Sequence, residues 1–279
     1  MRSISSEKIK EAVAELAIRA NIILRKDVLA ALKKSIYSER ETSAKNILKI
    51  LIDNAKIAKK NRMPICQDTG MAVVFCDIGD KVQIAGDVNK AIDDGIRLAY
   101  KEGSLRMSVV KDPFLRNNTE TNTPAVVHYN FIKGDKIKIT VIPKGFGCEN
   151  ASAIKMFNPT DTEKDIENFV VGVVESSGAD ACPPLVIGIG IGGTMDKAAS
   201  LATEAIIRPI NKSNSIKRIA KLEKDILTKV NKTGIGPAAL GGKTTALGVN
   251  ILSFPTHIAG LPVCVKISCH ATRSATGTI

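Results

Sequence analysis

Aromatic residues are scarce in this chain: only 4% of its 279 residues are Phe, Trp or Tyr, and Trp is absent. A surface that stacks unpaired bases needs such side chains, so a platform for single-stranded nucleic acid is poorly supplied. The net charge of +12 is spread over the chain, with no dense basic tail. We therefore expect no nucleic-acid partner. We interpret the positive charge as a general bias of the composition, which does not exclude that individual arginines bind anions.

Long apolar runs are also missing. The stretch from Pro183 to Ile191 falls far short of the roughly 20 residues that a membrane-spanning helix needs. The first residues are polar and show no signal peptide. These features predict a cytoplasmic protein with no membrane partner. Hydrophobic residues still make up 44% of the chain, which is enough for a sizeable core.

None of the six cysteines belongs to a C-x-x-C pair, which excludes a zinc ribbon and a thioredoxin-like motif. Cys66, Cys182 and Cys269 lie at the edges of expected elements, beside Pro, Gly or polar residues, where ligands and catalysts concentrate. Cys76 and Cys264 lie within apolar runs that are typical of a core. Spacing alone leaves open that all six are packing residues, because the three edge cysteines form no local ligand motif.

The hydrophobic periodicity predicts helices in residues 5–61 and a mixture of strands and helices after them. Residues 125–131 and 136–142 are expected to be strands, and Gly134–Asp135 predicts a tight turn that joins them as a hairpin. Residues 271–279 resemble a polar tail. The order of elements predicts an α+β, or mixed α/β, fold. We expect one domain, with a helical part at 1–62 and a mixed part at 63–279.

Two glycine-rich segments resemble nucleotide-binding motifs but lack essential parts. Residues 188–193 satisfy G-x-G-x-x-G, yet no second strand with a terminal acid follows, as an NAD site requires. Gly242–Lys243–Thr244 lacks the first glycine of a P-loop, because position 237 is Pro. The sequence therefore argues against NAD and ATP. A backbone anion nest at residues 188–193 fits these glycines better.

The chain carries seven short motifs, which are Pro64–Gly70 (PICQDTG), Asn122–Ala125 (NTPA), Lys144–Gly147 (KGFG), Ala181–Pro184 (ACPP), Gly190–Gly193 (GIGG), Thr256–Pro262 (THIAGLP) and Cys269–His270. In this order they resemble the class I fumarate hydratase and L-tartrate dehydratase family, from about Ile9 to the end. The resemblance implies the alpha subunit of a hydro-lyase that reversibly hydrates fumarate to L-malate. An alternative is the alpha subunit of an L-tartrate dehydratase, which forms oxaloacetate.

The resemblance also implies a 4Fe-4S cluster held by Cys66, Cys182 and Cys269. Thiolates are soft ligands that suit iron–sulfur clusters. Three thiolates for four irons leave one iron open, and an open iron acts as a Lewis acid on a substrate hydroxyl or carboxylate. The cluster cysteines would all belong to the mixed part of the chain.

Other side chains take family roles toward a small dicarboxylate substrate. The resemblance makes Asp68 and His257 catalytic, and its substrate-binding residues are Gln67, Arg106, Gly145 and Gly147. The roles of the four side chains have structural alternatives. Asp68 and Gln67 could form a polar loop that caps its own backbone, Arg106 could be a solvated surface arginine, and His257 could be structural. His270 is next to a ligand, and we interpret it as a residue that supports the ligand without binding the metal. His128 lies in an expected strand, and we interpret it as structural.

The chain departs from the family pattern in two places. Cys148 stands where related sequences often have Ser, and we interpret it as a packing residue. Single-chain members continue into a second domain that supplies further arginines, a lysine and the threonine base, whereas this chain ends at Ile279. We therefore expect a separate beta subunit to complete the active site, and an alpha2beta2 or alpha–alpha dimer assembly. Alone, the chain should be inactive.

A non-catalytic assembly or regulatory protein that kept the fold is a competing hypothesis. Such a protein would not need Asp68, Arg106 and His257, and their presence argues against it. The preference for fumarate over tartrate comes from its commoner metabolic role in the tricarboxylic acid cycle and not from particular residues.

Overall fold

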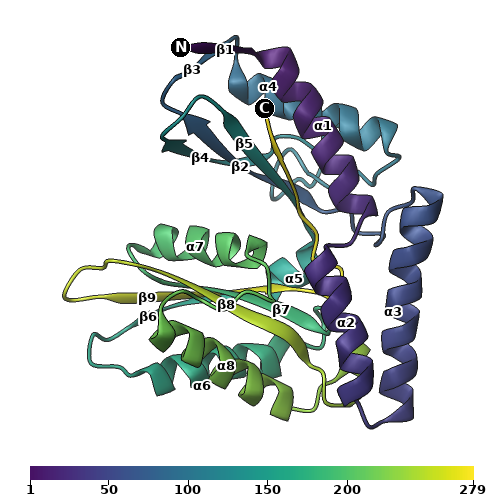
Figure 1. The fold of residues 1–279 in the computed structure, drawn as a ribbon, viewed down its shortest axis with the longest axis vertical. Helices are drawn as coiled ribbons and strands as arrows, with labels where there is room; N and C mark the ends of the chain where they lie inside the picture. Colours follow the sequence, from purple (N-terminus) through teal and green to yellow (C-terminus); the bar gives the residue numbers. More distant parts are fainter. The chain divides into compact units, whose positions relative to one another are not determined.

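The computed structural model describes residues 1–279, and the chain divides into two compact units. Unit 1 consists of Met1–Arg25, Ala55–Phe146 and Arg273–Ile279, and unit 2 consists of Lys26–Asn54 and Gly147–Thr272. Each unit combines segments that are distant in the sequence (Figure 1). Helices and mixed sheets occur together, so the α+β prediction is confirmed.

Unit 1 contains a four-stranded sheet in the order β10–β5–β2–β4 and a separate parallel pair, β1 and β3. In the larger sheet β2 runs parallel to β4 and antiparallel to β5. The strands are β1 (Arg2–Ser5), β2 (Met71–Gly79), β3 (Val82–Ala85), β4 (Val126–Ile132), β5 (Ile137–Lys144) and β10 (Ala275–Thr278).

Helices α1 (Ser6–Ile22) and α4 (Val88–Glu102) pack against each other, and α1 also covers β5 and β10. Each of the two helices begins with a capping side chain. The Ser5 side chain accepts a hydrogen bond from the backbone N–H of Lys8, and the Asp87 side chain accepts one from the N–H of Lys90. The buried faces of both helices join the apolar core of unit 1.

Unit 2 contains a four-stranded sheet in the order β6–β9–β7–β8. In Figure 1, α7 covers one face of this sheet, and α6 and α8 cover the other. The strands are β6 (Ala153–Phe157), β7 (Leu185–Gly192), β8 (Ala246–Phe254) and β9 (Leu261–Ser268). The helices around it are α6 (Glu163–Ser177), α7 (Met195–Ile207) and α8 (Lys217–Lys232).

The remaining elements are short or divided between the units. Helix α2 (Lys26–Ser38) belongs to unit 2, and α3 (Thr42–Asn61) contributes its residues up to Asn54 to unit 2 and the rest to unit 1. A short helix, α5 (Phe146–Asn150), precedes β6, and a 3-10 turn, η1 (Pro237–Ala239), precedes β8. None of the helices combines the length and apolar character that crossing a membrane requires.

The predicted hairpin between β4 and β5 is wrong. Both strands pair with β2, which lies between them in the sheet. The connecting turn crosses the end of β2, where the backbone N–H of Gly79 donates to Lys136 (2.9 Å) and that of Asp80 donates to Ile132 (2.8 Å). The apolar, mostly buried β2 takes the central position, and this non-local pairing overrides the local turn signal.

Residues 271–279 also differ from the expected polar tail, because they include β10. This strand pairs antiparallel with β5, and the hydroxyl groups of Thr140 and Thr276 are 2.9 Å apart across the pair. Ala275 is buried in the core of unit 1. A four-residue strand of small and polar residues has no strong periodic signal, so only its pairing identifies it.

The glycines of the G-x-G-x-x-G segment allow close packing. A Cβ atom on Gly188 would lie 2.2 Å from the Ala202 carbonyl oxygen of α7, and one on Gly190 would lie 2.0 Å from that of Ala198. One on Gly192 would lie 2.1 Å from the Phe254 oxygen. These glycines therefore let α7 and the end of β8 approach β7 closely, which explains the motif without a phosphate or an anion nest.

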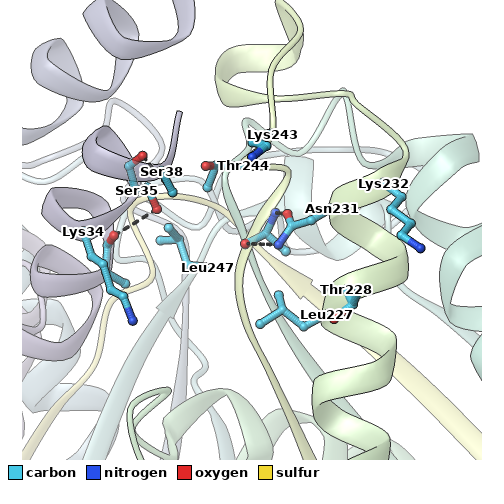
Figure 2. A pocket seen from close by; sticks show the side chains of 12 residues that line it. Lys34, Ser35, Ser38, Leu227, Thr228, Asn231, Lys232, Lys243, Thr244 and Leu247 are labelled. Atoms are coloured by element: carbon cyan, nitrogen blue, oxygen red, sulfur yellow. Dashed lines mark hydrogen bonds between the residues drawn. The ribbon is translucent and has the colours of Figure 1, made fainter. Parts of the chain in front are cut away.

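Of the Gly242–Lys243–Thr244 segment, Lys243 and Thr244 line a cleft of about 440 Å³ between α2, α8 and the start of β8. Figure 2 shows Lys34 of α2 and Lys232 of α8 on opposite sides of this cleft. The buried carboxylate of Glu39 accepts the backbone N–H groups of Lys243 (2.8 Å) and Thr244 (3.2 Å). A P-loop offers such groups to phosphate, whereas here they are bonded within the protein.

We predict that Gly190→Ala destabilises unit 2, because the added methyl group collides with the α7 backbone. The free energy of unfolding should fall by about 3 kcal/mol or more. Gly172→Ala is the matched control: a Cβ at this exposed position of α6 meets nothing within 4 Å. The free energy of unfolding of that variant should be unchanged or should rise by about 0.5–1 kcal/mol. Urea denaturation measures both, and equal stabilities of the two variants would contradict the packing role.

A second prediction concerns acid stability. Burial alone would raise the pKa of Glu39, but the backbone N–H groups of Arg40, Lys243, Glu41 and Thr244 together lower it. A carboxyl group whose pKa is lower in the folded state stabilises the protein above its unfolded pKa of about 4.3. That stabilisation is lost as the pH falls through the folded pKa.

Accordingly, Glu39→Gln should lower the free energy of unfolding at pH 7 by about 1–3 kcal/mol, because a neutral amide accepts these N–H groups less strongly. The variant should also lose stability less steeply than the wild type as the pH falls below about 4.3. Denaturation curves at pH 7 and pH 3.5 measure both effects. Glu175→Gln, at an exposed position of α6, is the control, and an identical acid response of all three proteins would refute the role of Glu39.

Candidate functional site

The segment that follows α3 in unit 1 carries three of the predicted site residues, Cys66, Gln67 and Asp68. The Cys66 thiol is partly exposed and lies 3.5 Å from the Gln67 side-chain oxygen. Gln67 is exposed. One Asp68 carboxylate oxygen accepts the N–H of Gly70 (3.0 Å), and the other accepts that of Phe146 (2.9 Å).

Gly145 is close to this carboxylate. A Cβ atom on Gly145 would lie 3.1 Å from the Asp68 Oδ2 atom. The structure therefore brings Asp68 and Gly145 close together. The two backbone contacts of Asp68 are also those that the loop-capping alternative predicts. Each carboxylate oxygen keeps a further lone pair, so these contacts do not exclude a substrate or a proton.

Buried side chains hold the carbonyl groups at the end of this segment. The Tyr100 hydroxyl lies 2.7 Å from the Thr69 carbonyl oxygen and 2.8 Å from that of Gly70. The Asn122 amide also donates to the Gly70 oxygen (3.1 Å). Burial raises the pKa of Tyr100, so its phenol stays protonated and acts as a donor. These contacts fix the backbone of the loop.

Arg106 is tied to the same loop through its backbone. The Thr69 hydroxyl donates to the Arg106 carbonyl oxygen (2.8 Å), and the Ser108 N–H donates to the Asn122 side chain (2.7 Å). The Arg106 side chain is exposed. An anchored backbone with an exposed guanidinium suits carboxylate binding, since the planar fork can reach a ligand without moving the main chain.

Cys182 and Cys269 belong to unit 2, and their segments meet. The Cys182 carbonyl oxygen accepts the backbone N–H of His270 (3.3 Å) and lies 3.1 Å from its ring Nδ1 atom. The Cys269 carbonyl oxygen accepts both the N–H (2.9 Å) and the hydroxyl (2.7 Å) of Thr272. Cys182 is exposed and has a φ of 53°, an uncommon conformation for a residue other than glycine.

His257 lies in an exposed loop between β8 and β9. Its Nδ1 atom accepts the N–H of Ala259 (3.2 Å), which leaves the proton of the neutral ring on Nε2. The Thr256 hydroxyl donates to the Gly193 carbonyl oxygen (2.9 Å). The loop is therefore attached to the glycine-rich end of β7, and the Nε2 atom of His257 remains available to donate.

Gly147 and Cys148 lie in α5. A Cβ atom on Gly147 would lie 3.6 Å from the Asp180 carbonyl oxygen, so this glycine is not required by space alone. Cys148 is buried, and its thiol lies 3.6 Å from the Ala181 oxygen. This position fits the interpretation of Cys148 as a packing residue, next to the segment that carries Cys182.

The chemistry of the cysteines fits an iron–sulfur cluster. None of the six is in a disulfide bond. Burial raises the pKa of Cys76 and of Cys264 to about 11, which keeps these thiols protonated and unsuited to bind metal. Cys66, Cys182 and Cys269 are at least partly exposed. Of the six, these three are therefore the accessible thiols, and they are the ones that the family resemblance predicts as ligands.

The predicted site residues are distributed over both units. Unit 1 contains Cys66, Gln67, Asp68, Arg106 and Gly145, and unit 2 contains Gly147, Cys182, His257 and Cys269. Neither unit by itself holds a group of three or more His, Cys, Asp or Glu side chains that could bind a metal ion. The joint action of these residues stays a prediction.

Sequence reasoning missed the residues that hold the Cys66 segment in place. These are Asn21, Tyr100 and Arg273, which are all buried in unit 1. Asn122 lies within one of the family motifs, but its contact to Gly70 was not foreseen. A buried polar residue has no distinctive pattern in the sequence, because its partner is chosen by the fold.

Comparison with known proteins identifies the family of the chain. A family model described as "Fumarate hydratase (Fumerase)" matches residues 10–278. The chain is 42% identical over 276 residues to a protein of Methanocaldococcus jannaschii named "Putative L(+)-tartrate dehydratase subunit alpha", and the match covers 96% of each chain.

More distant relatives have the same kind of name. The chain is 29% identical over 272 residues to the "L(+)-tartrate dehydratase subunit alpha" of Escherichia coli strain UTI89, which covers 96% of this chain and 90% of that one. The protein of the same name from Escherichia coli strain K12 is 28% identical over the same shares. The chain therefore belongs to the fumarate hydratase (Fumerase) family and is a hydro-lyase.

Proposed function

We propose that this chain is the alpha subunit of an iron–sulfur-dependent hydro-lyase that reversibly hydrates fumarate to L-malate. The observation that carries the proposal is the contrast among the cysteines. The three accessible thiols lie on loops whose backbones are held by hydrogen bonds, whereas Cys76 and Cys264 are buried with raised pKa values. The 279 residues would act as one alpha domain.

Cys66, Cys182 and Cys269 would hold the 4Fe-4S cluster. When bound, the cluster supplies a Lewis-acidic iron for the substrate hydroxyl. The meeting of the Cys182 and Cys269 segments at His270 supports this ligand set, as does the unusual φ of Cys182. His270 would orient the Cys182 backbone from beside a ligand and would not touch the metal itself.

The other predicted residues would bind and orient the dicarboxylate. Arg106 offers an exposed guanidinium for one carboxylate, Gln67 offers an exposed amide, and Gly145 and Gly147 offer backbone N–H groups. His257 would donate from Nε2 to a substrate oxygen. Asp68 would hold the loop through its contacts to Gly70 and Phe146 and exchange a proton with the substrate.

Dehydration of L(+)-tartrate to oxaloacetate is the second candidate. The names of the relatives favour it, whereas the description of the family model favours fumarate. Fumarate, malate and tartrate share a four-carbon dicarboxylate frame, and the alpha-chain residues above would bind its carboxylates in either case. Discrimination between these substrates would depend largely on a beta subunit. The names of the relatives, which are alpha subunits, also suggest that such a partner exists.

The beta subunit would supply the remaining half of the active site. We further propose an alpha2beta2 assembly or an alpha–alpha dimer, a cytoplasmic location and a place in the tricarboxylic acid cycle. The alpha chain alone would then be inactive, even when its cluster is reconstituted.

The test is an anaerobic assay of the alpha chain, with and without its beta subunit, on fumarate, L-malate and both tartrates. We expect turnover of fumarate and L-malate by the pair only, because each chain supplies part of the site. Strong turnover by the reconstituted alpha chain alone would refute the shared active site. Exclusive turnover of L(+)-tartrate would establish the second candidate.

The ligand set is tested in the same preparation. Cys66→Ser, Cys182→Ser and Cys269→Ser should each reduce iron content and visible absorbance and lower kcat by at least about 100-fold. Cys264→Ala is the control, because this buried thiol packs among alanines and is predicted to bind nothing. Full iron content in any of the three serine variants would remove that cysteine from the ligand set.

Asp68→Asn separates the two roles of Asp68. The amide presents an N–H group to one of the two backbone donors, so the free energy of unfolding should fall by about 1–3 kcal/mol. If Asp68 also exchanges a proton with the substrate, kcat per folded molecule should fall by about 100-fold or more. An unchanged kcat at reduced stability would leave Asp68 with only its loop-capping role.

A further inference from the structure

Arg273 is a buried arginine that belongs to none of the family motifs described above. It lies four residues after Cys269 in the sequence, where the chain returns to unit 1, and only 5% of its surface is exposed. Its Nη1 atom donates to the Asn21 side-chain oxygen (3.1 Å), and its Nη2 atom donates to the Asp68 carbonyl oxygen (2.8 Å).

Neither acceptor of the guanidinium is a carboxylate. Burying a charge among neutral acceptors is costly, so stability alone gives little reason for an arginine here. A charge-assisted hydrogen bond, in contrast, holds its acceptor more firmly than a neutral one. The planar guanidinium reaches two different acceptors at once, which a lysine ammonium on a flexible stem does less well. An arginine at this position is therefore suited to hold the Asp68 peptide group in a fixed orientation.

Asn21 completes a clamp around Cys66 and Gln67. Its side-chain oxygen accepts from Arg273, its amide donates to the Ala17 carbonyl oxygen (3.0 Å), and its own carbonyl oxygen accepts the N–H of Ile65 (2.9 Å). Ile65 directly precedes Cys66, and Asp68 directly follows Gln67. The backbone is thus held on one side of the Cys66–Gln67 dipeptide by the Asn21 carbonyl group and on the other by the Arg273 side chain, and Arg273 also bonds the Asn21 side chain.

We propose that Arg273 is a positioning residue of the hydro-lyase site: through the Asp68 carbonyl group and Asn21, it sets the orientation of the segment that carries Cys66 and Gln67. This inference rests on the proposed function. Ligands and substrate-binding groups must be held to about 0.5 Å, and the residues that lock them contribute to activity without touching the substrate. Arg273 acts in this way on a predicted metal ligand and a predicted substrate-binding residue.

The test compares Arg273→Lys with Arg19→Lys. Arg19 is a matched control, since its Nη2 atom also donates from unit 1 to a backbone carbonyl oxygen, that of Thr276 (2.7 Å), without contacting the Cys66 segment. The first readout uses the cluster-free chain. Iodoacetamide alkylation, followed by mass spectrometry, gives the rates at Cys66 and at Cys182 in the same sample.

We expect Arg273→Lys to change the Cys66 alkylation rate by about threefold or more, because thiol reactivity follows local environment and access. The Cys182 rate should stay constant, and Arg19→Lys should change neither rate. Asn21→Ser is a milder variant that keeps the backbone contact to Ile65 and should change the Cys66 rate in the same direction by less. If Arg273→Lys does not fold, an unchanged Cys66 rate in Asn21→Ser overturns the proposal.

The second readout uses the cluster-loaded alpha–beta complex. Arg273→Lys should lower kcat by about tenfold or more while KM changes little, since a small misplacement of site groups acts on the reaction more than on binding. Unchanged Cys66 alkylation and unchanged kcat would overturn the proposal, as would equal effects of Arg19→Lys. If the wild-type complex has no hydro-lyase activity, the proposed function fails, while the alkylation rates still decide whether Arg273 positions Cys66.

Discussion

Three consecutive carbonyl groups, those of Asp68, Thr69 and Gly70, accept hydrogen bonds from side chains buried in unit 1. The donors are Arg273 for the first, Tyr100 for the second and both Tyr100 and Asn122 for the third. A loop bonded mainly to water would sample many conformations, because ordering each residue costs about 1–2 kcal/mol. The buried donors remove this freedom in advance from Asp68, Thr69 and Gly70, the residues that directly follow Cys66 and Gln67.

The pairing of backbone polar groups also accounts for two motifs that resemble nucleotide-binding sites. Backbone N–H groups bind phosphate only when they are unpaired, and here the fold has used several of them. Glu39 accepts those of Lys243 and Thr244, and Pro255 accepts that of Gly193. Gly188 and Gly190 serve the contact between β7 and α7. What such a loop binds depends on which acceptors its backbone N–H groups already bond, and not on the pattern of glycines.

Much of the local structure was predictable. Ser5 and Asp87 accept hydrogen bonds from the first turns of α1 and α4, because capping depends on residues three positions apart. The predicted hairpin failed for the opposite reason. Pairing of β2 with both β4 and β5 joins segments that are distant in the sequence, and the turn at Gly134 contains no information about a third strand.

The sequence by itself determined the element types, the family and the cysteines that merit attention as ligands, because periodicity, capping and short motifs are local properties. The tertiary structure decided the order of the strands, the burial that separates Cys76 and Cys264 from the accessible thiols, and the contacts of Arg273 and Asn21. Burial and hydrogen-bond partners arise from segments that meet only in the folded chain. A residue whose importance depends on its partner therefore cannot be recognised until the fold supplies that partner.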